Sequence, residues 1–311
     1  MSLILKINFQ LLGPAKNTNN NNGLGRQFYR GMDVHAWGLS ESSSQDNFGI
    51  IPETSVNGAS LWKYVPRSLI SPEKGVGEDF SGVVEAAGTN SGFDVGDEVY
   101  GITFTVAGGT LQDIISVSTK SSIVVRKPED MSWEQAAALP LVWLTARTTI
   151  ARVESCLQKS GRLTVLGGSS AVGMHVLQLA NQRGWKVLTT CSSRNSEFVK
   201  SMGATSVVDY KTDDVVQAVR DFGPAAIIDC VGGTLCIGLA ERYVTIVGDK
   251  TGRDSMGGAA IYFWHPKMAI RTILGKIGLG KGYDCVNLEF RKEWLEETLN
   301  LDRSNIVIDS T

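Results

Sequence analysis

Residues 166–173 (LGGSSAVG) contain the residue types and spacing that most clearly allow chemistry in this sequence. The stretch follows an apolar strand-like run and precedes a run of helix formers, the context in which glycines indicate a phosphate site. Glycine lets the backbone approach a pyrophosphate, and a helix N-terminus offers free N–H groups and the positive end of its dipole. Gly168 and Gly173 match two positions of a dinucleotide motif, with the small Ser170 or Ala171 at the third. The alternative is an ordinary glycine-rich turn.

The end of the next apolar run, residues 190–194, indicates which dinucleotide would bind. An enzyme that uses NADH usually has a carboxylate here for the ribose 2′-hydroxyl, and none occurs before Glu197. Ser192 can donate a hydrogen bond to a 2′-phosphate, and Arg194 can add a charge-assisted one. The alternative is that Ser193 caps a helix and Arg194 points into water. The pattern favours NADPH.

Alternating strand-like and helix-like runs after residue 162 place the glycine turn in a larger fold. The expected strands are 163–166, 186–191, 206–208, 225–231 and 243–247, and the expected helices are 171–183, 194–202 and 213–221. This alternation predicts an α/β fold with a Rossmann-type, doubly wound parallel sheet. Ligands of such sheets bind beyond the carboxyl ends of the strands, which is where the turn would lie.

An earlier region, residues 75–125, has a different pattern. Four short apolar runs, 82–86, 98–102, 113–117 and 123–125, are separated by glycine-rich turns. Many short strands with such turns predict a β-barrel or sandwich-like domain. Ser132, with Gln135 three residues later, matches a capping box that opens a helix. We therefore expect a change of architecture near residue 128.

The first 32 residues contain basic but no acidic side chains, since the first acidic residue is Asp33. A basic leader without acidic residues is typical of an organelle transit peptide. The other interpretation is a disordered polar arm, because residues 17–22 are nearly all asparagine. We expect a disordered leader over residues 1–32 and a mitochondrial or cytoplasmic location.

Composition argues against several function classes. The formal net charge is -2, without a basic stripe, which argues against nucleic-acid binding. No apolar run reaches the roughly 20 residues needed to cross a bilayer. The five cysteines are scattered, with no CxxC pair, so we expect neither a disulfide framework nor a structural zinc site.

Several motifs resemble the signatures of the medium-chain dehydrogenase/reductase superfamily, and within it the zinc-independent, reticulon-4-interacting-protein-like group of quinone-oxidoreductase relatives. The motifs are 77–84 (GEDFSGVV), 96–101 (GDEVYG), 136–140 (AAALP) with 144–146 (LTA), 166–173, 203–204 (GA) with 209–210 (DY), and 229–233 (DCVGG). The resemblance covers about residues 75–311 and implies a GroES-like, β-rich substrate domain beside the Rossmann domain. Zinc members carry a Gly-His-Glu motif, whereas the corresponding stretch here is Gly77-Glu78-Asp79, so no metal is expected.

The resemblance also implies a domain order. After the leader come a GroES-like substrate domain at 33–127, a Rossmann NADPH-binding domain at 128–265, and a return segment toward the substrate domain at 266–311. An Asn-Pro-x-Asp loop usual in the family is not found between Asp33 and Glu73, residues 234–242 are short for a crossover helix, and a closing helix and strand are expected beyond Thr311. The substrate domain is therefore expected to be incomplete, which weakens the expectation of activity.

The resemblance further implies NADPH-dependent hydride transfer to a quinone or an α,β-unsaturated carbonyl, in a protein that forms a homodimer. The implied cofactor residues are Ser169, Ala171 and Val172 at the pyrophosphate, Ser192 and Tyr210 at the adenosine 2′-phosphate (with Arg194 added here for its charge), and Cys230 and Val231 near the nicotinamide ribose.

Without a metal, catalysis would depend on positioning and electrostatics. Thr145 is our candidate hydroxyl in the substrate pocket; the alternative is a helix-interior residue bonded to its own backbone. Tyr262 and Trp264 would line an aromatic pocket or pack in the core. Two functions stay open: the reductase, and a non-catalytic NADPH-binding redox sensor or pseudo-enzyme.

Overall fold

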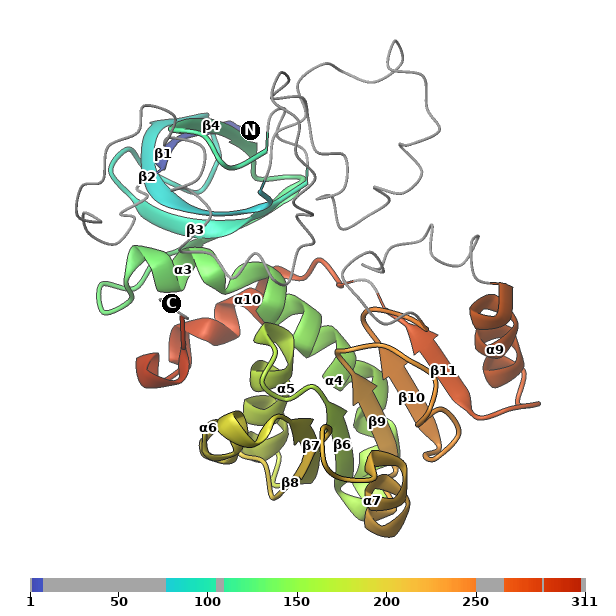
Figure 1. Cartoon of the computed structure of the whole chain (residues 1–311). Coiled ribbons are helices and arrows are strands. Elements are labelled where there is room, and N and C mark those ends of the chain that lie inside the picture. Colours follow the sequence, from blue (N-terminus) through green and yellow to red (C-terminus); the bar gives the residue numbers. More distant parts are fainter. Residues whose placement is uncertain (1, 8–76, 105–108, 250–265, 287, 309–311) are drawn as a thin grey trace, which may run out of the picture. The chain divides into compact units, whose positions relative to one another are not determined.

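The computed structural model describes residues 2–7, 77–104, 109–249, 266–286 and 288–308, which divide into two compact units (Figure 1). Within these ranges, the first unit contains the residues up to 141 and from 290 onward, and the second contains residues 142–289. Our expectations for Tyr262, for Trp264 and for the stretch between Asp33 and Glu73 lie outside the described residues.

The first unit is built on a five-stranded antiparallel sheet with the strand order β4-β1-β2-β3-β5. Its strands are β1 (Ser2–Ile7), β2 (Asp79–Ala87), β3 (Glu98–Thr103), β4 (Ile114–Ser118) and β5 (Ser122–Arg126). The four strands predicted between residues 82 and 125 are confirmed as β2 to β5. One face of the sheet forms the core, which contains Leu3, Leu5, Ile7, Phe80, Val84, Val99, Ile115, Val117 and Val124.

Strand β1 corrects the expectation that residues 1–32 form a disordered leader. Leu3, Leu5 and Ile7 are buried, and the side chains between them are exposed. This period of two is the pattern of a strand with one face on a core. The strand pairs with β2 on one side and with β4 on the other, so its partners supply the stability that a short isolated segment lacks. Residues 8–32 lie outside the described part of the chain.

Short helices complete the first unit. They are α3 (Trp133–Ala138), α10 (Lys292–Glu296) and the 3-10 helices η5 (Glu297–Asn300) and η6 (Arg303–Asn305). The predicted capping box is confirmed, since Ser132 Oγ accepts the Gln135 N–H and Gln135 Oε1 accepts the Ser132 N–H, each at 3.2 Å. The Tyr100 hydroxyl lies 2.5 Å from Thr298 Oγ1 and joins the C-terminal segment to β3.

The second unit is a six-stranded parallel sheet with the strand order β11-β10-β9-β6-β7-β8 (Figure 1). Its strands are β6 (Arg162–Leu166), β7 (Lys186–Cys191), β8 (Ser206–Asp209), β9 (Ala226–Asp229), β10 (Arg242–Thr245) and β11 (Gly282–Cys285). Its helices are α4 (Pro140–Ser160, of which the first two residues belong to the first unit), α5 (Ala171–Gln182), η3 (Ser193–Asn195), α6 (Ser196–Ser201), α7 (Val215–Phe222) and α9 (Pro266–Lys276). The order reverses at β6, which confirms the predicted doubly wound sheet.

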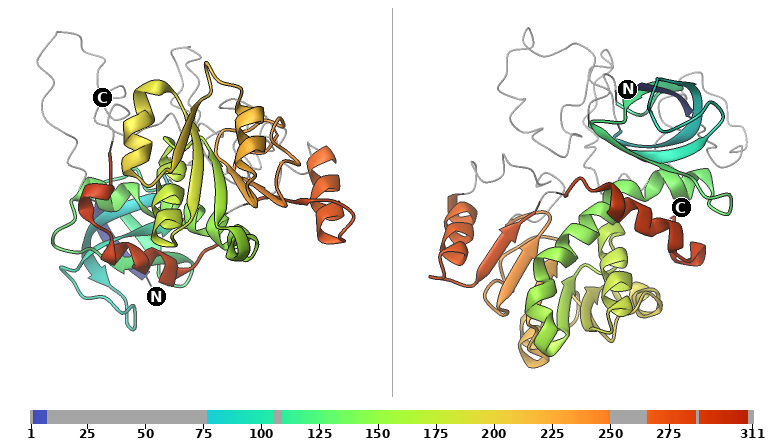
Figure 2. Two further views of the ribbon diagram at one scale, coloured as in Figure 1. Left: turned by 90° about the horizontal axis from the view of Figure 1, so that it is seen from below. Right: turned by 180° about the vertical axis from the view of Figure 1, so that it is seen from behind.

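Helices cover both faces of this sheet (Figure 2). Right-handed crossovers between parallel strands place α5 and α6 on one face and α7 on the other. Trp143 of α4 meets His175 of α5 edge-on, with 5.5 Å between ring centroids, so α4 lies beside α5. Every residue of β9 is buried, as expected for a parallel strand covered on both faces.

The connection from β9 to β10 contains no helix in its described residues, 230–241. Cys236 and Ala240 of this connection are buried in one core cluster with Ile227 and Tyr243. The segment that the sequence marked as short for a crossover helix therefore covers the sheet with a turn and two small side chains.

The domain boundaries differ from the prediction in two places. Residues 128–141, expected in the Rossmann domain, belong to the first unit, and residues 266–289, expected in the return segment, belong to the second. The second difference arises because β11 pairs in parallel with β10, where the Tyr243 and Tyr283 rings stack with 5.8 Å between centroids. No apolar run marked β11, because Asp284 interrupts its four residues.

Candidate dinucleotide-binding site

The turn between β6 and α5 is tied to the end of β7. The Gly167 N–H donates to Thr190 Oγ1 at 2.9 Å, and the Gly168 N–H donates to the Thr190 carbonyl at 3.1 Å. Gly167 has φ +83°, a conformation that favours glycine. A Cβ at Gly168 would lie 2.1 Å from Thr189 Oγ1, and one at Gly173 would lie 2.2 Å from the Gly167 carbonyl oxygen. Glycine is therefore required at all three positions by the fold itself.

Helix α5 begins at this turn with a serine cap. Ser170 Oγ accepts the Gly173 N–H at 3.0 Å and donates to the Gly167 carbonyl at 2.8 Å. The N–H groups of Ala171 and Val172 lie in the first helical turn, where backbone donors have no intrahelical acceptor. These donors and the helix dipole fit a pyrophosphate. The sequence analysis treated Ser170 only as a small residue, although serine before a helical run is also the usual N-cap signal.

Two predicted adenosine-site residues lie together at the corner formed by β7 and β8. Cys191 pairs with Asp209 in the sheet, so Ser192 and Tyr210, which follow them, are neighbours. The Tyr210 N–H donates to the Cys191 carbonyl at 3.3 Å. Ser192 is buried, whereas Tyr210 and Arg194 are exposed. The corner thus offers one buried hydroxyl and two exposed side chains for a ligand.

Asp209 is a residue of this corner to which the sequence analysis gave no role beyond its place in the 209–210 motif. Its Oδ2 accepts the Ser193 N–H at 2.8 Å and its Oδ1 accepts the Lys211 N–H at 2.9 Å. The pKa of Asp209 is lowered. The hydrogen bond from the Lys211 N–H is the largest cause, and the Ser193 N–H and hydroxyl and the charge of Lys211 add to it. An acidic residue for the ribose is usually expected at the end of the second strand, here β7. This carboxylate instead comes from the end of β8. A negative charge therefore lies beside the expected 2′-phosphate position.

The residues expected near the nicotinamide follow β9 directly. The Cys230 N–H donates to the Leu166 carbonyl at 3.0 Å. Cys230 is buried, and burial, with Asp229 adding to it, raises the pKa of its thiol, so the thiol stays neutral. Val231 is 50% exposed, and a Cβ at Gly167 would lie 2.4 Å from Val231 Cγ1. The turn after β9 therefore packs directly on the glycine turn.

Thr145, the candidate catalytic hydroxyl, lies half-buried in the second turn of α4. It belongs to a helix, whereas the other site residues follow strands β6 to β9 or open α5. Its catalytic role stays a prediction.

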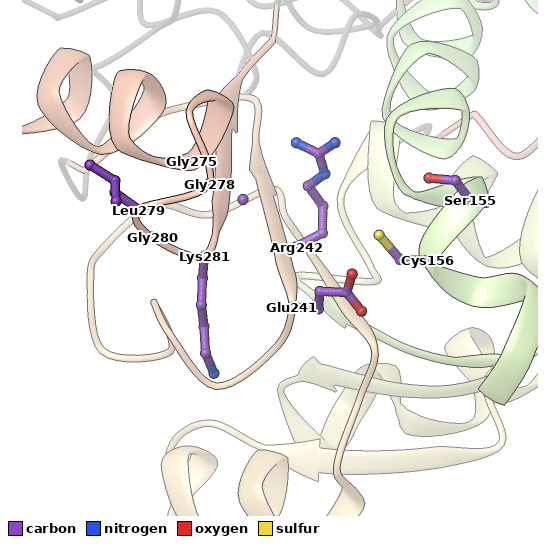
Figure 3. Close-up of a pocket in the computed structure, with 10 residues that line it drawn as sticks. Ser155, Cys156, Glu241, Arg242, Gly275, Gly278, Leu279, Gly280 and Lys281 are labelled. Carbon is purple, nitrogen blue, oxygen red and sulfur yellow. The ribbon is translucent and has the colours of Figure 1, made fainter.

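A cavity of about 830 Å³ lies elsewhere in the second unit, beside the amino ends of β10 and β11 (Figure 3). Ser155 and Cys156 of α4 lie on one side and the glycine-rich loop that includes Lys281 on the other, with Glu241 and Arg242 between them. Ligands of doubly wound sheets bind at the carboxyl ends of the strands, so this cavity is not the predicted dinucleotide site.

The described residues contain no group of three or more His, Cys, Asp and Glu side chains that could hold a metal ion. His175, the histidine behind the glycine turn, is buried with Nδ1 3.2 Å from Gln178 Oε1. All five cysteines are free. Among the helices in the described ranges, none is both long and apolar enough to cross a membrane.

Comparison with known proteins identifies relatives for this arrangement. Residues 171–249 match the family described as zinc-binding dehydrogenase. The mitochondrial NAD(P)H oxidoreductase RTN4IP1 of Homo sapiens is 36% identical over 166 residues, which are 51% of this chain and 41% of the relative. The trans-enoyl reductase pvhC of Talaromyces variabilis is 30% identical over 243 residues, which are 72% of this chain and 67% of the relative.

A solved structure shares the fold over nearly the whole chain. The quinone oxidoreductase from Coxiella burnetii superposes with a TM-score of 0.63 at 21% identity, covering 98% of this chain and 80% of that one. The chain spans about half the length of several curated relatives that it matches. The shared fold, the family match and the relatives together show that the chain belongs to the medium-chain dehydrogenase/reductase superfamily, in its quinone-oxidoreductase-like branch.

Proposed function

We propose that this protein is an NADPH-dependent oxidoreductase that transfers hydride to a quinone or an α,β-unsaturated carbonyl without zinc. The observation that carries the proposal is the turn after β6, where Gly167, Gly168 and Gly173 bring backbone N–H groups and the α5 N-terminus to the carboxyl edge of a doubly wound sheet. Relatives named NAD(P)H oxidoreductase and trans-enoyl reductase support the reaction class.

Each part of the site has a distinct task in this mechanism. The N–H groups of Ala171 and Val172, with the neighbouring Ser169, bind the pyrophosphate, and Ser170 keeps the turn closed. Bound NADPH would supply the hydride. Cys230 and Val231 border the nicotinamide end, and Thr145 is the candidate hydroxyl for orienting the substrate carbonyl or passing a proton.

The adenosine end selects the dinucleotide. Ser192 donates a hydrogen bond to the 2′-phosphate, Arg194 adds a charge-assisted one, and Tyr210 borders the same corner. The negative charge of Asp209 would repel a 2′-phosphate, but each of its oxygens already accepts a hydrogen bond from a backbone N–H group. We therefore keep NADPH as the proposed cofactor, with NADH as the competitor that must be measured.

Zinc independence rests on the residues that stand in place of a metal site. In the stretch 77–79, Asp79 is half-buried and its Oδ1 accepts the Leu141 N–H at 3.0 Å, so this carboxylate caps the first turn of helix α4. Desolvation of the carboxylate, with a contribution from Glu78, raises the pKa of Asp79 well above its usual value. His175 is the one histidine of the segment that matches the zinc-binding dehydrogenase family, and Gln178 holds it.

A non-catalytic NADPH-binding redox sensor is the second candidate function. The proposed roles of the described residues leave it open, because every residue assigned above except Thr145 serves the dinucleotide and not a substrate. Such a protein would use the same dinucleotide site without turnover.

Location and assembly complete the proposal. We propose a mitochondrial or cytoplasmic protein, since one relative is named as mitochondrial, and a homodimer. Helix α9 carries an exposed apolar row, formed by Ile270, Ile273 and Leu274, and the exposed Ile277 follows directly after the helix. Light scattering of the purified chain tests the dimer.

The deciding experiment titrates the purified full chain with NADPH and with NADH by nicotinamide fluorescence and then adds a model quinone or enone. Tighter binding of NADPH with oxidation on adding the acceptor supports the reductase. Binding without oxidation by either acceptor supports the sensor. Binding of neither dinucleotide contradicts both functions, and a preference for NADH contradicts the roles of Ser192 and Arg194.

A further inference from the structure

Asp229 closes the turn that follows β9. The residue is fully buried and lies between Leu166 of β6 and Thr245 of β10 in the sheet register. Its Oδ1 accepts the Val231 N–H at 3.0 Å and the Gly232 N–H at 2.8 Å. An aspartate that accepts from the backbone two and three residues ahead fixes a tight turn.

The neighbouring strand ends in the same way. Thr245 Oγ1 accepts the Val247 N–H at 3.2 Å and the Gly248 N–H at 2.9 Å. Gly232 and Gly248, three residues after each acceptor, both have positive φ, +85° and +82°. Two adjacent strands therefore end in matching turns at the edge that carries the glycine turn, and a side chain determines the shape of each.

The Asp229 turn holds one side chain against the glycine turn. Val231 is half exposed, and its Cγ1 occupies the space that a Cβ at Gly167 would need. The Val231 N–H is one of the two donors to the Asp229 carboxylate. Loss of the carboxylate would therefore remove the hydrogen bond that fixes the backbone of Val231. The position of the Val231 side chain beside Gly167 thus depends on the buried carboxylate of Asp229.

We propose that Asp229 is a positioning residue of the dinucleotide site, which holds Val231 and Gly232 so that the nicotinamide end of the cofactor is bound in one orientation. The inference rests on the proposed function, because it assumes that a dinucleotide lies along this edge. Asp229 acts through the backbone of the turn and makes no contact with the cofactor itself. The adenosine corner, built from β7 and β8, does not depend on it.

Two substitutions separate this role from general stability. Asp229→Asn keeps an oxygen that can accept both N–H groups. Its amide nitrogen would take the place of Oδ2, which lies near the Thr245 and Tyr243 hydroxyls without a well-formed hydrogen bond. Asp229→Ala removes the acceptor. Ile227→Ala, in the same strand, is the control that loses core packing but leaves the turn intact.

The test compares the affinity of the full chain for NADPH with its affinity for adenosine 2′,5′-bisphosphate, which lacks the nicotinamide. Asp229→Ala should weaken NADPH binding about tenfold relative to the bisphosphate. Asp229→Asn and Ile227→Ala should leave the ratio of the two affinities near the wild-type value. Where the wild type turns over a quinone, kcat should fall by up to about 100-fold in Asp229→Ala, as misplacement of reacting groups predicts.

Amide hydrogen exchange of Val231 and Gly232 in the apoprotein gives a readout that needs no cofactor. Both amides should exchange faster in Asp229→Ala and stay protected in Asp229→Asn. An unchanged affinity ratio in Asp229→Ala, or a fall of both affinities by the same factor, would overturn the inference while leaving the proposed function intact. A wild type that binds neither molecule would overturn the proposed function, and the inference with it.

Discussion

The turn after β6 and the corner after β7 and β8 lie at the same edge of one sheet but are built differently. The turn is shaped by missing side chains, since a Cβ at Gly168 or Gly173 would lie within 2.2 Å of a neighbouring atom. The corner is shaped by side chains that reach solvent, such as Arg194 and Tyr210. Packing therefore constrains the turn and charge tunes the corner. Substitutions in the turn should reduce stability and all dinucleotide binding, and substitutions in the corner should mainly change the choice of dinucleotide.

The substitution Gly173→Ala should have the largest effect. The new Cβ would lie 2.2 Å from the Gly167 carbonyl oxygen and 3.0 Å from Gly168 Cα, and these backbone atoms cannot move without opening the turn. We expect the free energy of unfolding to fall by about 3 kcal/mol, as overpacking does at its upper end, with loss of NADPH binding. Urea denaturation and fluorescence titration measure both. In Gly280→Ala, the control, the Cβ would make an ordinary contact of 3.5 Å with Leu274, and both properties should be kept.

The pH dependence of stability should show that the region behind the turn is tightly packed. Burial, opposed by a hydrogen bond with Gln178, lowers the pKa of His175 to about 4, against about 6.5 in the unfolded chain. As the pH falls, the unfolded state therefore binds a proton before the folded state does. The contribution of neutral His175 to the free energy of unfolding is fully present above pH 6.5 and is lost as the pH falls toward 4. The loss amounts to roughly 2 kcal/mol at pH 5.

The measurement is the difference in unfolding free energy between the wild type and His175→Gln at pH 7 and at pH 5. Asp79 has a raised pKa and acts in the opposite direction, but it is present in both proteins, so the difference isolates the histidine. A difference that does not change between the two pH values would mean that His175 is accessible to water.

The substitution Ser170→Ala should have a smaller effect on the turn. It removes the acceptor of the Gly173 N–H at the start of α5, and loss of a serine N-cap costs about 1 kcal/mol. Affinity for NADPH and for NADH should fall by the same factor, because both dinucleotides share the pyrophosphate. Ser201→Ala, at the end of α6, is the matched control and should change neither affinity. A change in the ratio of the two affinities would contradict the division between turn and corner.

The substitution Asp209→Asn should lower stability by about 1 kcal/mol, because one of two backbone N–H groups loses its acceptor, and should shift selectivity. It removes a negative charge beside Ser192 while keeping an oxygen that can accept a backbone N–H. The affinity for NADPH relative to NADH should rise several-fold at low salt and less at high salt, since salt screens exposed charges. Asp221→Asn on α7 removes the same charge elsewhere and should not change the ratio. An equal effect of both substitutions would mean that net charge alone sets the preference.

The sequence was most informative where a local pattern decides the structure. The runs of alternating strands and helices after residue 162, the Ser132–Gln135 capping box and the glycine turn were predicted and are confirmed. The signal was weakest for β1 and β11, because each depends on strands far away in the chain. A strand of three alternating apolar side chains, or one of four residues with Asp284 in it, carries too little local preference to be recognised alone.

By itself, the sequence determined the doubly wound fold and the position of the glycine turn within it, since both follow from hydrophobic periodicity and from the unique freedom of glycine. Only the tertiary structure decided which side chains share a corner. Asp209 reaches the end of β7 because it pairs beside Cys191 in the sheet, and Asp229 supports Val231 because β9 lies between β6 and β10. Strand order brings these residues together, and strand order depends on the packing of the whole sheet and not on any local run of residues.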